Sequence, residues 1–279
     1  MIILEMQLQL KKFDITSITD DSVVVFIGKR RTGKSFLVRD LLYHHRDIPI
    51  GTLISATEAA NKYYSDMIPS LFIHDEYTPE IIDNVVKRQK LIIKKINKEV
   101  DKHGHSKIDP RAFLILDDCL FNNSWVRDKN IISIFLNGRH YKMMFMITMQ
   151  YPLGIPPSLR TNLDYVFILR ENNMSNRRRI YENYAGMIPS WELFNDIMNQ
   201  CTENYECLVL KVNAQSNKLE DQIFWYKAEA HDNFKIGAKE FWAIHNNNIN
   251  QSDDDEDTLF DVRQVKRKGP SVNIKKVLK

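Results

Sequence analysis

Short apolar runs alternate with amphipathic segments along most of this chain. The run at residues 22–27 is continuous and rich in β-branched side chains, which is typical of a strand buried on both faces of a parallel sheet. Similar runs predict strands at residues 52–55, 71–74, 112–116, 143–148 and 165–169. The alternating residues 6–13 predict an edge strand that leads into this sheet.

Between these runs, apolar residues recur at helical spacing. Residues 34–45 carry Phe36, Leu37, Leu41 and Leu42 on one face. Residues 79–100 predict a long helix with a broad isoleucine- and valine-rich face and a lysine-rich face opposite it. A solvated helix face explains these lysines more simply than a DNA-binding stripe. The alternation of strands and helices over residues 20–245 predicts an α/β fold, a mainly parallel central sheet flanked by helices on both faces.

The pattern changes near residue 245, where an Asn-rich stretch is followed by an acidic block and then a basic one. Such a composition cannot bury enough apolar surface to fold alone. We therefore expect one folded domain over residues 1–245, with its edge strand at the start, and a disordered charged tail over 246–279.

Composition narrows the class of protein but does not decide the function. The net charge of +3 is too small to establish nucleic-acid binding by itself. The three cysteines have no metal-ligand spacing, and their odd number favours a reducing compartment. No apolar stretch approaches 18 residues, so we expect neither a transmembrane segment nor a secretory signal.

The first candidate for a functional site is the sequence FIGKRRTGKSF. It lies at the end of the first apolar run and at the start of the first predicted helix. Two of the chain's nine glycines stand here five positions apart, with a lysine and a serine after the second. A strand, a glycine loop and a helix form the context that a phosphate-binding loop requires, because backbone N–H groups converge on an anion at the helix N-terminus. The predicted nucleotide-binding residues are Gly28, Lys29, Arg30, Arg31, Thr32, Gly33, Lys34, Ser35 and Phe36. Lys34 would reach the β- and γ-phosphates, and the Ser35 hydroxyl would coordinate Mg²⁺.

Two adjacent carboxylates end the strand predicted at 112–116. In phosphate-loop enzymes the first, here Asp117, holds the magnesium shell, and the second, here Asp118, takes a proton from the attacking water or orients it. The next predicted strand ends near Thr148 and Gln150, and Gln150 is a candidate sensor of the γ-phosphate. Together these residues predict a site that hydrolyses ATP with Mg²⁺.

An arginine from a neighbouring subunit would complete such a site. Arg139, between the carboxylate strand and the sensor strand, is the first candidate, and we expect it near the catalytic edge of the sheet. Arg160 and Arg170 compete for the same role. The run Arg177–Arg179 begins a helical stretch and is equally consistent with phosphate-backbone contacts and with an ordinary polar helix face.

As a set, GKRRTGKS, FLILDDC, NGRHYKMMFMITMQ and FILRENNMSNRRRIYENY resemble the genome-packaging ATPases of nucleocytoplasmic large DNA viruses, a branch of the FtsK–HerA superfamily of DNA motors. The resemblance extends from about Phe13 to about His245. One departure is Asp118, where the superfamily commonly has Glu.

This resemblance implies a P-loop NTPase core of the additional-strand catalytic-glutamate type. It further implies a homo-oligomeric ring, a pentamer or a hexamer, that hydrolyses ATP to move double-stranded viral DNA into a preformed capsid. By motif position, Lys34 and Asp118 would be catalytic, Ser35 and Asp117 would be metal ligands, Gln150 would be the sensor and Arg139 the trans-acting arginine. The expected partners are DNA and a capsid-vertex or inner-membrane protein, in the host cytoplasm (the virus factory) and the virion.

Three other functions share part of this pattern. A small-molecule P-loop kinase would use the first motif, but the paired carboxylates and Gln150 favour water as the nucleophile. A GTPase is disfavoured because no Asn-Lys-x-Asp motif follows the fourth strand. A capsid scaffold that binds ATP without turning it over is excluded only by measured turnover.

Overall fold

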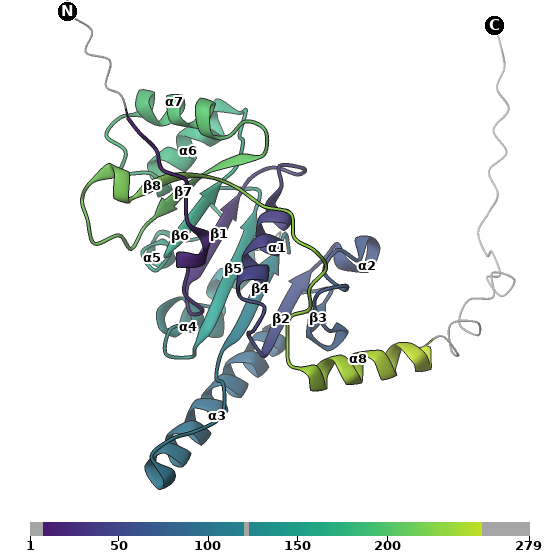
Figure 1. Cartoon of the computed structure of the whole chain (residues 1–279). Helices are drawn as coiled ribbons and strands as arrows, with labels where there is room; N and C mark the ends of the chain where they lie inside the picture. The colour runs from purple at the N-terminus through teal and green to yellow at the C-terminus, as the bar shows by residue number, and fades with distance from the viewer. Residues whose placement is uncertain (1–7, 120–122, 253–279) are drawn as a thin grey trace, which may run out of the picture.

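An eight-stranded sheet forms the centre of this computed structural model, which describes residues 8–119 and 123–252 (Figure 1). The strands are β1 (Val23–Ile27), β2 (Ile50–Ser55), β3 (Ile73–His74), β4 (Ala112–Asp117), β5 (Met143–Met149), β6 (Tyr165–Ile168), β7 (Glu206–Lys211) and β8 (Ile223–Lys227). Their order across the sheet is β3-β2-β4-β5-β1-β6-β7-β8.

The six strands from β3 to β6 are parallel, which confirms the mainly parallel α/β sheet. Strand β5 lies between the phosphate-loop strand β1 and the carboxylate strand β4, so it is the additional strand of the expected core. Strands β7 and β8 extend the sheet as an antiparallel pair beyond β6, which the sequence analysis did not predict.

Eight α-helices surround this sheet in the described part of the chain. They are α1 (Lys34–His44), α2 (Glu58–Asn61), α3 (Pro79–His103), α4 (Lys129–Asn137), α5 (Pro157–Arg160), α6 (Met174–Tyr184), α7 (Trp191–Cys201) and α8 (Lys239–Ser252). Four short 3₁₀ turns supplement them, η1 (Ile15–Ser17), η2 (Ser70–Phe72), η3 (Asn123–Arg127) and η4 (Leu219–Asp221). No helix within residues 8–119 and 123–252 combines the length and the apolarity needed to cross a membrane.

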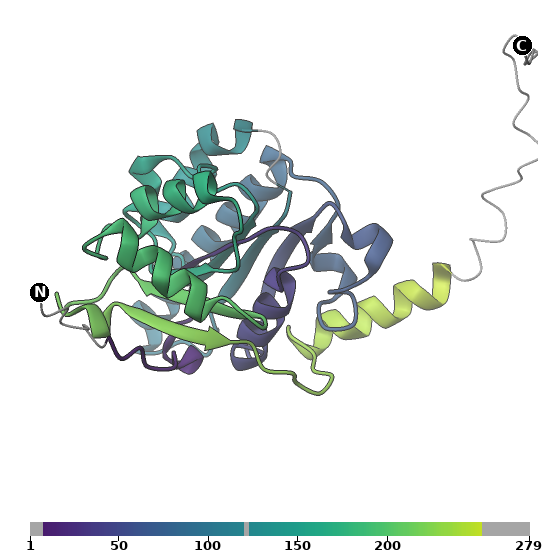
Figure 2. The same ribbon diagram turned by 90° about the horizontal axis from the view of Figure 1, so that it is seen from above.

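The two faces of the sheet have different covers (Figures 1 and 2). Alternate residues of β1 belong to different cores, with Val23, Val25 and Ile27 on one face and Val24 and Phe26 on the other. The first core is closed by apolar side chains of α3, α4, α6 and α7. The second is closed by α1 and by irregular segments, residues 13–18, 64–72 and 234–236. Helices therefore cover both faces as expected, although loops cover much of the second.

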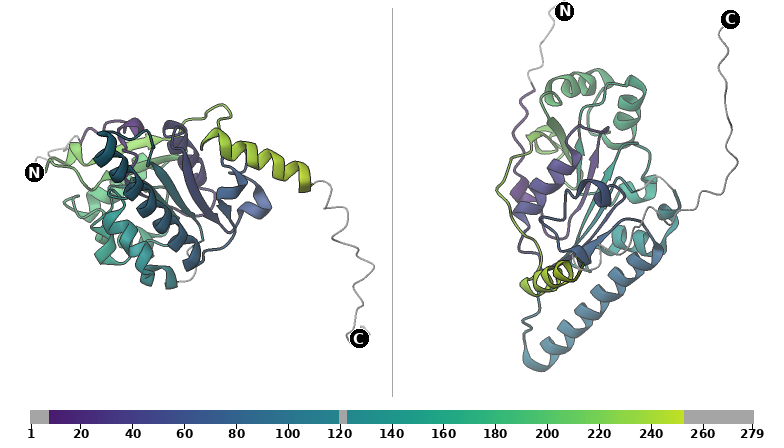
Figure 3. Two further views of the ribbon diagram at one scale, coloured as in Figure 1. Left: turned by 90° about the horizontal axis from the view of Figure 1, so that it is seen from below. Right: turned by 90° about the vertical axis from the view of Figure 1, so that its right-hand side faces the viewer.

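Helix α3 begins and ends with well-formed caps. The Thr78 side chain accepts a hydrogen bond from the Ile81 N–H, and Gly104 ends the helix in the left-handed conformation, at φ 74°. Its first half buries Ile82, Val85 and Val86, whereas Ile92, Ile93 and Ile96 in its second half are only partly buried. The far end of the helix extends past the sheet (Figures 1 and 3). Among the described residues, the first half of the predicted apolar face is therefore packed more completely than the second.

Two predicted boundaries differ from the structure. Among the described residues of the predicted edge strand at 6–13, only a bridge between Lys12 and Trp225 of β8 forms, so this segment lies along the sheet edge without being a strand. Helix α8 continues to Ser252, beyond the predicted end of the domain at residue 245, because the Asn-rich stretch adopts helical backbone. The disordered tail stays a prediction, and its residues 253–279 lie outside the described part.

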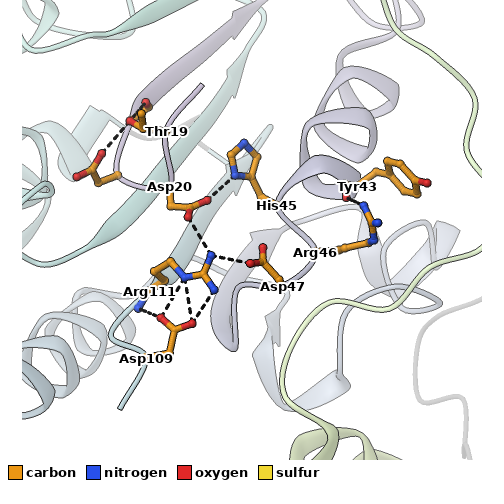
Figure 4. Close-up of polar contacts among 10 residues, drawn as sticks. Thr19, Asp20, Tyr43, His45, Arg46, Asp47, Asp109 and Arg111 are labelled. Carbon is orange, nitrogen blue, oxygen red and sulfur yellow. Dashed lines mark hydrogen bonds and ion pairs between the residues drawn. The ribbon is translucent and has the colours of Figure 1, made fainter. Parts of the chain in front are cut away.

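Charged side chains connect the loops at the amino ends of the parallel strands (Figure 4). The Arg111 guanidinium, just before β4, donates to Asp109, Asp20 and Asp47, with its nitrogens 2.7–3.0 Å from their oxygens. Asp20 also lies 2.5 Å from Nδ1 of His45. The hydrogen bond from Arg111 lowers the pKa of Asp109, so this carboxylate is charged and paired at neutral pH.

Candidate nucleotide-hydrolysis site

The phosphate loop joins β1 to α1 at the carboxyl edge of the sheet. Gly28 at its start donates its N–H to the Met149 carbonyl, 3.0 Å away, which fixes the loop to β5. A Cβ on Gly28 would lie 2.7 Å from the Thr32 hydroxyl, and Gly33 has a φ of 105°. Only glycine fits both positions without strain, which explains the spacing of the motif.

The Lys34 ammonium is buried, with its side chain 5% exposed, and it lies across the inside of this loop. It donates to the carbonyls of Gly28 and Lys29 at 3.0 and 3.2 Å. It also lies 3.3 Å from a carboxylate oxygen of Asp118. The structure thus joins the first motif to the second through one ion pair.

The carboxylates stand at the end of β4, in register with β5. The Thr148 hydroxyl of β5 donates to Asp117 across 2.7 Å and accepts the N–H of Asp118 across 2.9 Å. Burial and the neighbouring Asp118 charge raise the pKa of Asp117, although the Thr148 hydrogen bond opposes this. Asp118 itself has a φ of 47°, a conformation unusual for a residue other than glycine.

Gln150 completes this arrangement by donating its amide N–H to the same Asp118 oxygen that Lys34 approaches, at 3.1 Å. Four predicted site residues, Lys34, Asp117, Asp118 and Gln150, therefore meet at one edge of the sheet. Thr148 lies among them, and the sequence analysis noted it at the strand end without assigning it a role.

Tyr64 is a site residue that the sequence analysis missed. Its side chain is 1% exposed, and its hydroxyl has no hydrogen-bond partner within the described residues. The hydroxyl faces the Ser35 hydroxyl and the Asp117 carboxylate, and burial beside that charge raises the pKa of Tyr64 well above 10. The segment is held by Glu58, which accepts the N–H groups of Tyr64 and Ser65 at 2.8 Å. Tyr64 follows β2, the strand beside β4, with α2 between them, and no motif in the sequence singles it out.

These residues fit a magnesium ion. Ser35 and Asp117 supply two oxygen donors, the kind that Mg²⁺ prefers. The buried Asp117 carboxylate has a raised pKa, so a nearby cation would stabilise its charged form. The unpartnered Tyr64 hydroxyl faces the same place.

Arg139 does not lie at this edge. It precedes β5 and therefore stands at the amino ends of the parallel strands, so the expectation that it lies near the catalytic edge is wrong. Its guanidinium pairs with Asp164, a carboxylate that is 3% exposed and also accepts hydrogen bonds from the Val23 N–H and the Asn213 amide. This pairing gives Arg139 a structural role within its own subunit.

Of the two competing candidates, Arg160 and Arg170, it is Arg170 that stands exposed at the carboxyl edge. It follows β6 and donates to Asn172 at 3.1 Å. Arg160 instead donates to the Ile155 carbonyl and to Asn183 and lies over the Tyr184 ring. Arg177 is buried against Asn195 and Asn199, so the run it begins is not a uniform basic surface.

Two large-virus proteins show the family of this chain. It is 42% identical over 238 residues to the uncharacterized protein L437 of Acanthamoeba polyphaga mimivirus, covering 85% of this chain and 83% of that protein. It is 41% identical over 229 residues to the uncharacterized protein 075L of Invertebrate iridescent virus 6, covering 79% and 83%. Comparison with models of protein families finds no match.

Solved structures match at the level of the fold. The genome packaging NTPase B204 from Sulfolobus turreted icosahedral virus 2, in complex with AMP, superposes with a TM-score of 0.51 at 15% identity, covering 76% of this chain and 100% of B204. The EssC ATPases 2 and 3 from Geobacillus thermodenitrificans give 0.50 at 14% identity, covering 85% and 44%. The loop, the additional strand and the carboxylates thus stand in a P-loop NTPase fold, and the chain belongs to one family of viral proteins with L437 of mimivirus and 075L of Invertebrate iridescent virus 6.

Proposed function

We propose that this protein is an ATP-hydrolysing motor that moves double-stranded viral DNA into the capsid during virion assembly. One observation carries the hydrolytic part of the proposal: Lys34 and Gln150 converge on one oxygen of Asp118, 3.3 and 3.1 Å away, at the carboxyl edge of a P-loop fold. The DNA-moving part is supported by the likeness of this fold to the packaging NTPase B204. A carboxylate in this position can accept a proton from an attacking water. In a kinase, the hydroxyl of the acceptor substrate would have to occupy the place of that water.

Each side chain has a distinct task in this mechanism. Lys34 stabilises the γ-phosphate charge after exchanging its contacts with the loop carbonyls and Asp118 for the phosphate oxygens. Asp118, released from that ion pair, accepts the proton of the attacking water. Gln150, already bonded to Asp118, orients the water and reports the γ-phosphate. Thr148 keeps the two carboxylates apart by bonding to both residues.

Ser35 and Asp117 are the residues that would hold Mg²⁺. The ion would supply positive charge to offset the negative charge that develops on the phosphates. The Tyr64 hydroxyl faces Asp117 and would position this ligand by donating to it once the site is loaded.

An arginine from a neighbouring subunit of a homo-oligomeric ring completes the site by adding positive charge near the γ-phosphate. Arg170 is the candidate for this role, because it is exposed at the carboxyl edge and Arg139 is committed to Asp164. Double-stranded DNA in the ring brings the subunits into register and stimulates hydrolysis. A capsid-vertex or inner-membrane protein docks the motor, in the host cytoplasm and the virion.

ATP turnover of the full chain, measured with and without double-stranded DNA over a range of salt, tests this function. We expect turnover that rises with DNA, and stimulation that fades as salt screens the phosphate contacts. Turnover without DNA stimulation would indicate another P-loop NTPase. Binding of ATP without turnover, in assembled rings with DNA, would indicate a nucleotide-gated scaffold.

A further inference from the structure

An apolar pocket of about 370 Å³ opens beside the phosphate loop. Its lining consists of Gly33, Phe36, Leu37, Tyr205, Lys227 and Ala228. Strand β7 begins and β8 ends at this edge, so the pocket lies on the β6–β8 side of β1, while Asp117 lies on the β4 side. The pocket and the carboxylates therefore flank the loop from opposite sides.

Two aromatic side chains of this pocket are left open to solvent. Phe36 is 41% exposed and Tyr205 is 70% exposed, although both are large and apolar. The Tyr205 ring lies against the loop, with its Cδ1 3.7 Å from the position of a Cβ on Gly33. Exposed aromatic faces next to a loop of this kind offer a surface on which a flat ring can stack.

The backbone that presents Tyr205 is strained. Asn204 and Tyr205 have successive φ values of 51° and 65°, and the left-handed region is disfavoured for a bulky residue such as Tyr205. The tyrosine ring recovers little of this cost through burial, since most of it remains exposed. The opposite wall is firmly placed, because buried Asp40 accepts the Glu229 N–H at 3.0 Å and the Tyr226 hydroxyl at 2.6 Å.

We propose that this pocket binds the purine base of the nucleotide, with Phe36 and Tyr205 as its stacking surfaces. The inference rests on the proposed function, because it concerns the nucleotide whose phosphates the loop binds. Gly33 belongs to both the loop and the pocket, so one nucleotide spans the two. Stacking on an aromatic side chain suits any base, because every base has a flat π-face.

The same pocket discriminates poorly between bases. Lys227 is the single charged residue of its lining, and no buried amide or carboxylate stands ready to read the edge of a base. Strong discrimination needs such polar groups, because an unpaired buried partner is what penalises the wrong ligand. We therefore expect ATP and GTP to bind within about tenfold of each other.

Equilibrium binding of ATP, GTP and inorganic tripolyphosphate to the full chain tests this inference. In Tyr205→Ala we expect ATP affinity to fall about tenfold, a value within the range for loss of one stacking partner. Tripolyphosphate has no base, so its affinity should not change. Tyr205→Phe keeps the ring and should bind ATP like the unmodified chain. Leu91→Ala, which truncates an exposed apolar side chain on α3, is the control and should also bind normally.

Tyr205→Gly also removes the ring, and glycine adopts the positive φ of this position without strain. This variant therefore replaces Tyr205→Ala in the test if Tyr205→Ala fails to fold. Unchanged ATP affinity in either ring-less variant would overturn the inference while leaving the phosphate loop intact. An equal loss for ATP and tripolyphosphate would also overturn it, because the defect would then lie in the loop. Failure of the unmodified chain to bind either ligand would remove the proposed function along with the inference.

Discussion

The two edges of one parallel sheet both carry charged side chains, and most of those at the amino edge are paired with one another. At the amino edge, Arg111 pairs with three carboxylates and Arg139 with the buried Asp164. At the carboxyl edge, the Tyr64 hydroxyl has no hydrogen-bond partner among the described residues, and Asp118 has a left-handed φ of 47°. Charge clusters whose members saturate each other hold a fold together. A buried donor without a hydrogen-bond partner, or a residue with a strained backbone, is instead typical of a site that binds a ligand.

The largest expected effect is at Arg170. We predict that Arg170→Ala lowers DNA-stimulated turnover by about 10³-fold, since an arginine supplied in trans is worth at least that where it is established. Mixing this variant with Lys34→Ala should restore part of the activity, because some interfaces then pair an intact lysine with an intact arginine. No recovery in rings shown to have co-assembled would exclude the trans role.

Asp118→Asn comes next. The amide cannot accept the proton of water, so hydrolysis should slow at least ~100-fold while ATP still binds. Lys34→Ala should instead lose nucleotide affinity. Single-turnover hydrolysis and equilibrium binding separate the two. Near-normal turnover in Asp118→Asn would move the proton-accepting role to another group.

Tyr64→Phe removes only a hydroxyl from the metal side of the site. Outer-shell groups of this kind typically change metal affinity 10–100-fold, so the Mg²⁺ concentration for half-maximal ATPase should rise ~10-fold. Turnover at saturating Mg²⁺ should stay close to normal. An unchanged Mg²⁺ titration would mean that the buried hydroxyl serves packing alone.

Arg139→Ala should show the opposite behaviour to Arg170→Ala. It leaves Asp164 buried with only two of its partners, at a cost of about 1–3 kcal/mol in the free energy of unfolding. Turnover per folded subunit should remain normal. Denaturant unfolding measures the first quantity and ATPase at low temperature the second. Asp164→Asn in the same chain should recover part of the stability. A stable but inactive Arg139→Ala would return this arginine to the catalytic role.

The smallest effect is a pH dependence at the amino edge. The pKa of Asp109 is lowered by Arg111, so its folded-state value lies below its unfolded-state value. Its contribution to stability is therefore present above about pH 4 and is lost as the pH falls through the folded-state pKa. Arg111→Met should melt below the unmodified chain at pH 7, with a difference that shrinks towards pH 3. A difference that stays constant with pH would show that Arg111 acts through packing.

The sequence was enough to predict those parts of the site whose residues are close together along the chain. The loop and the Asp117–Asp118 pair each carry their chemistry within a few residues of one strand, and parallel pairing places both strand ends at one edge. Arg139 was misplaced although the signal was present, because a residue before a parallel strand lies at the opposite edge from one after it. Tyr64 and Tyr205 reach the loop through tertiary packing, which no spacing in the sequence encodes. The β7–β8 pair was missed because expectation of a parallel sheet did not allow for antiparallel strands at its border.

The bridge between Lys12 and Trp225 has a consequence for how copies of this protein meet. Strand β8 is the border of the sheet, and an open border strand invites pairing with the same strand of another molecule. Here Phe13 donates its N–H to the Trp225 carbonyl at 2.8 Å, and the Trp225 N–H donates to the Lys11 carbonyl at 3.1 Å. Lys12 adds a charge over the same strand by pairing with Glu229. The segment therefore covers the border of β8 at Trp225 and disfavours edge-to-edge pairing between copies of the chain there.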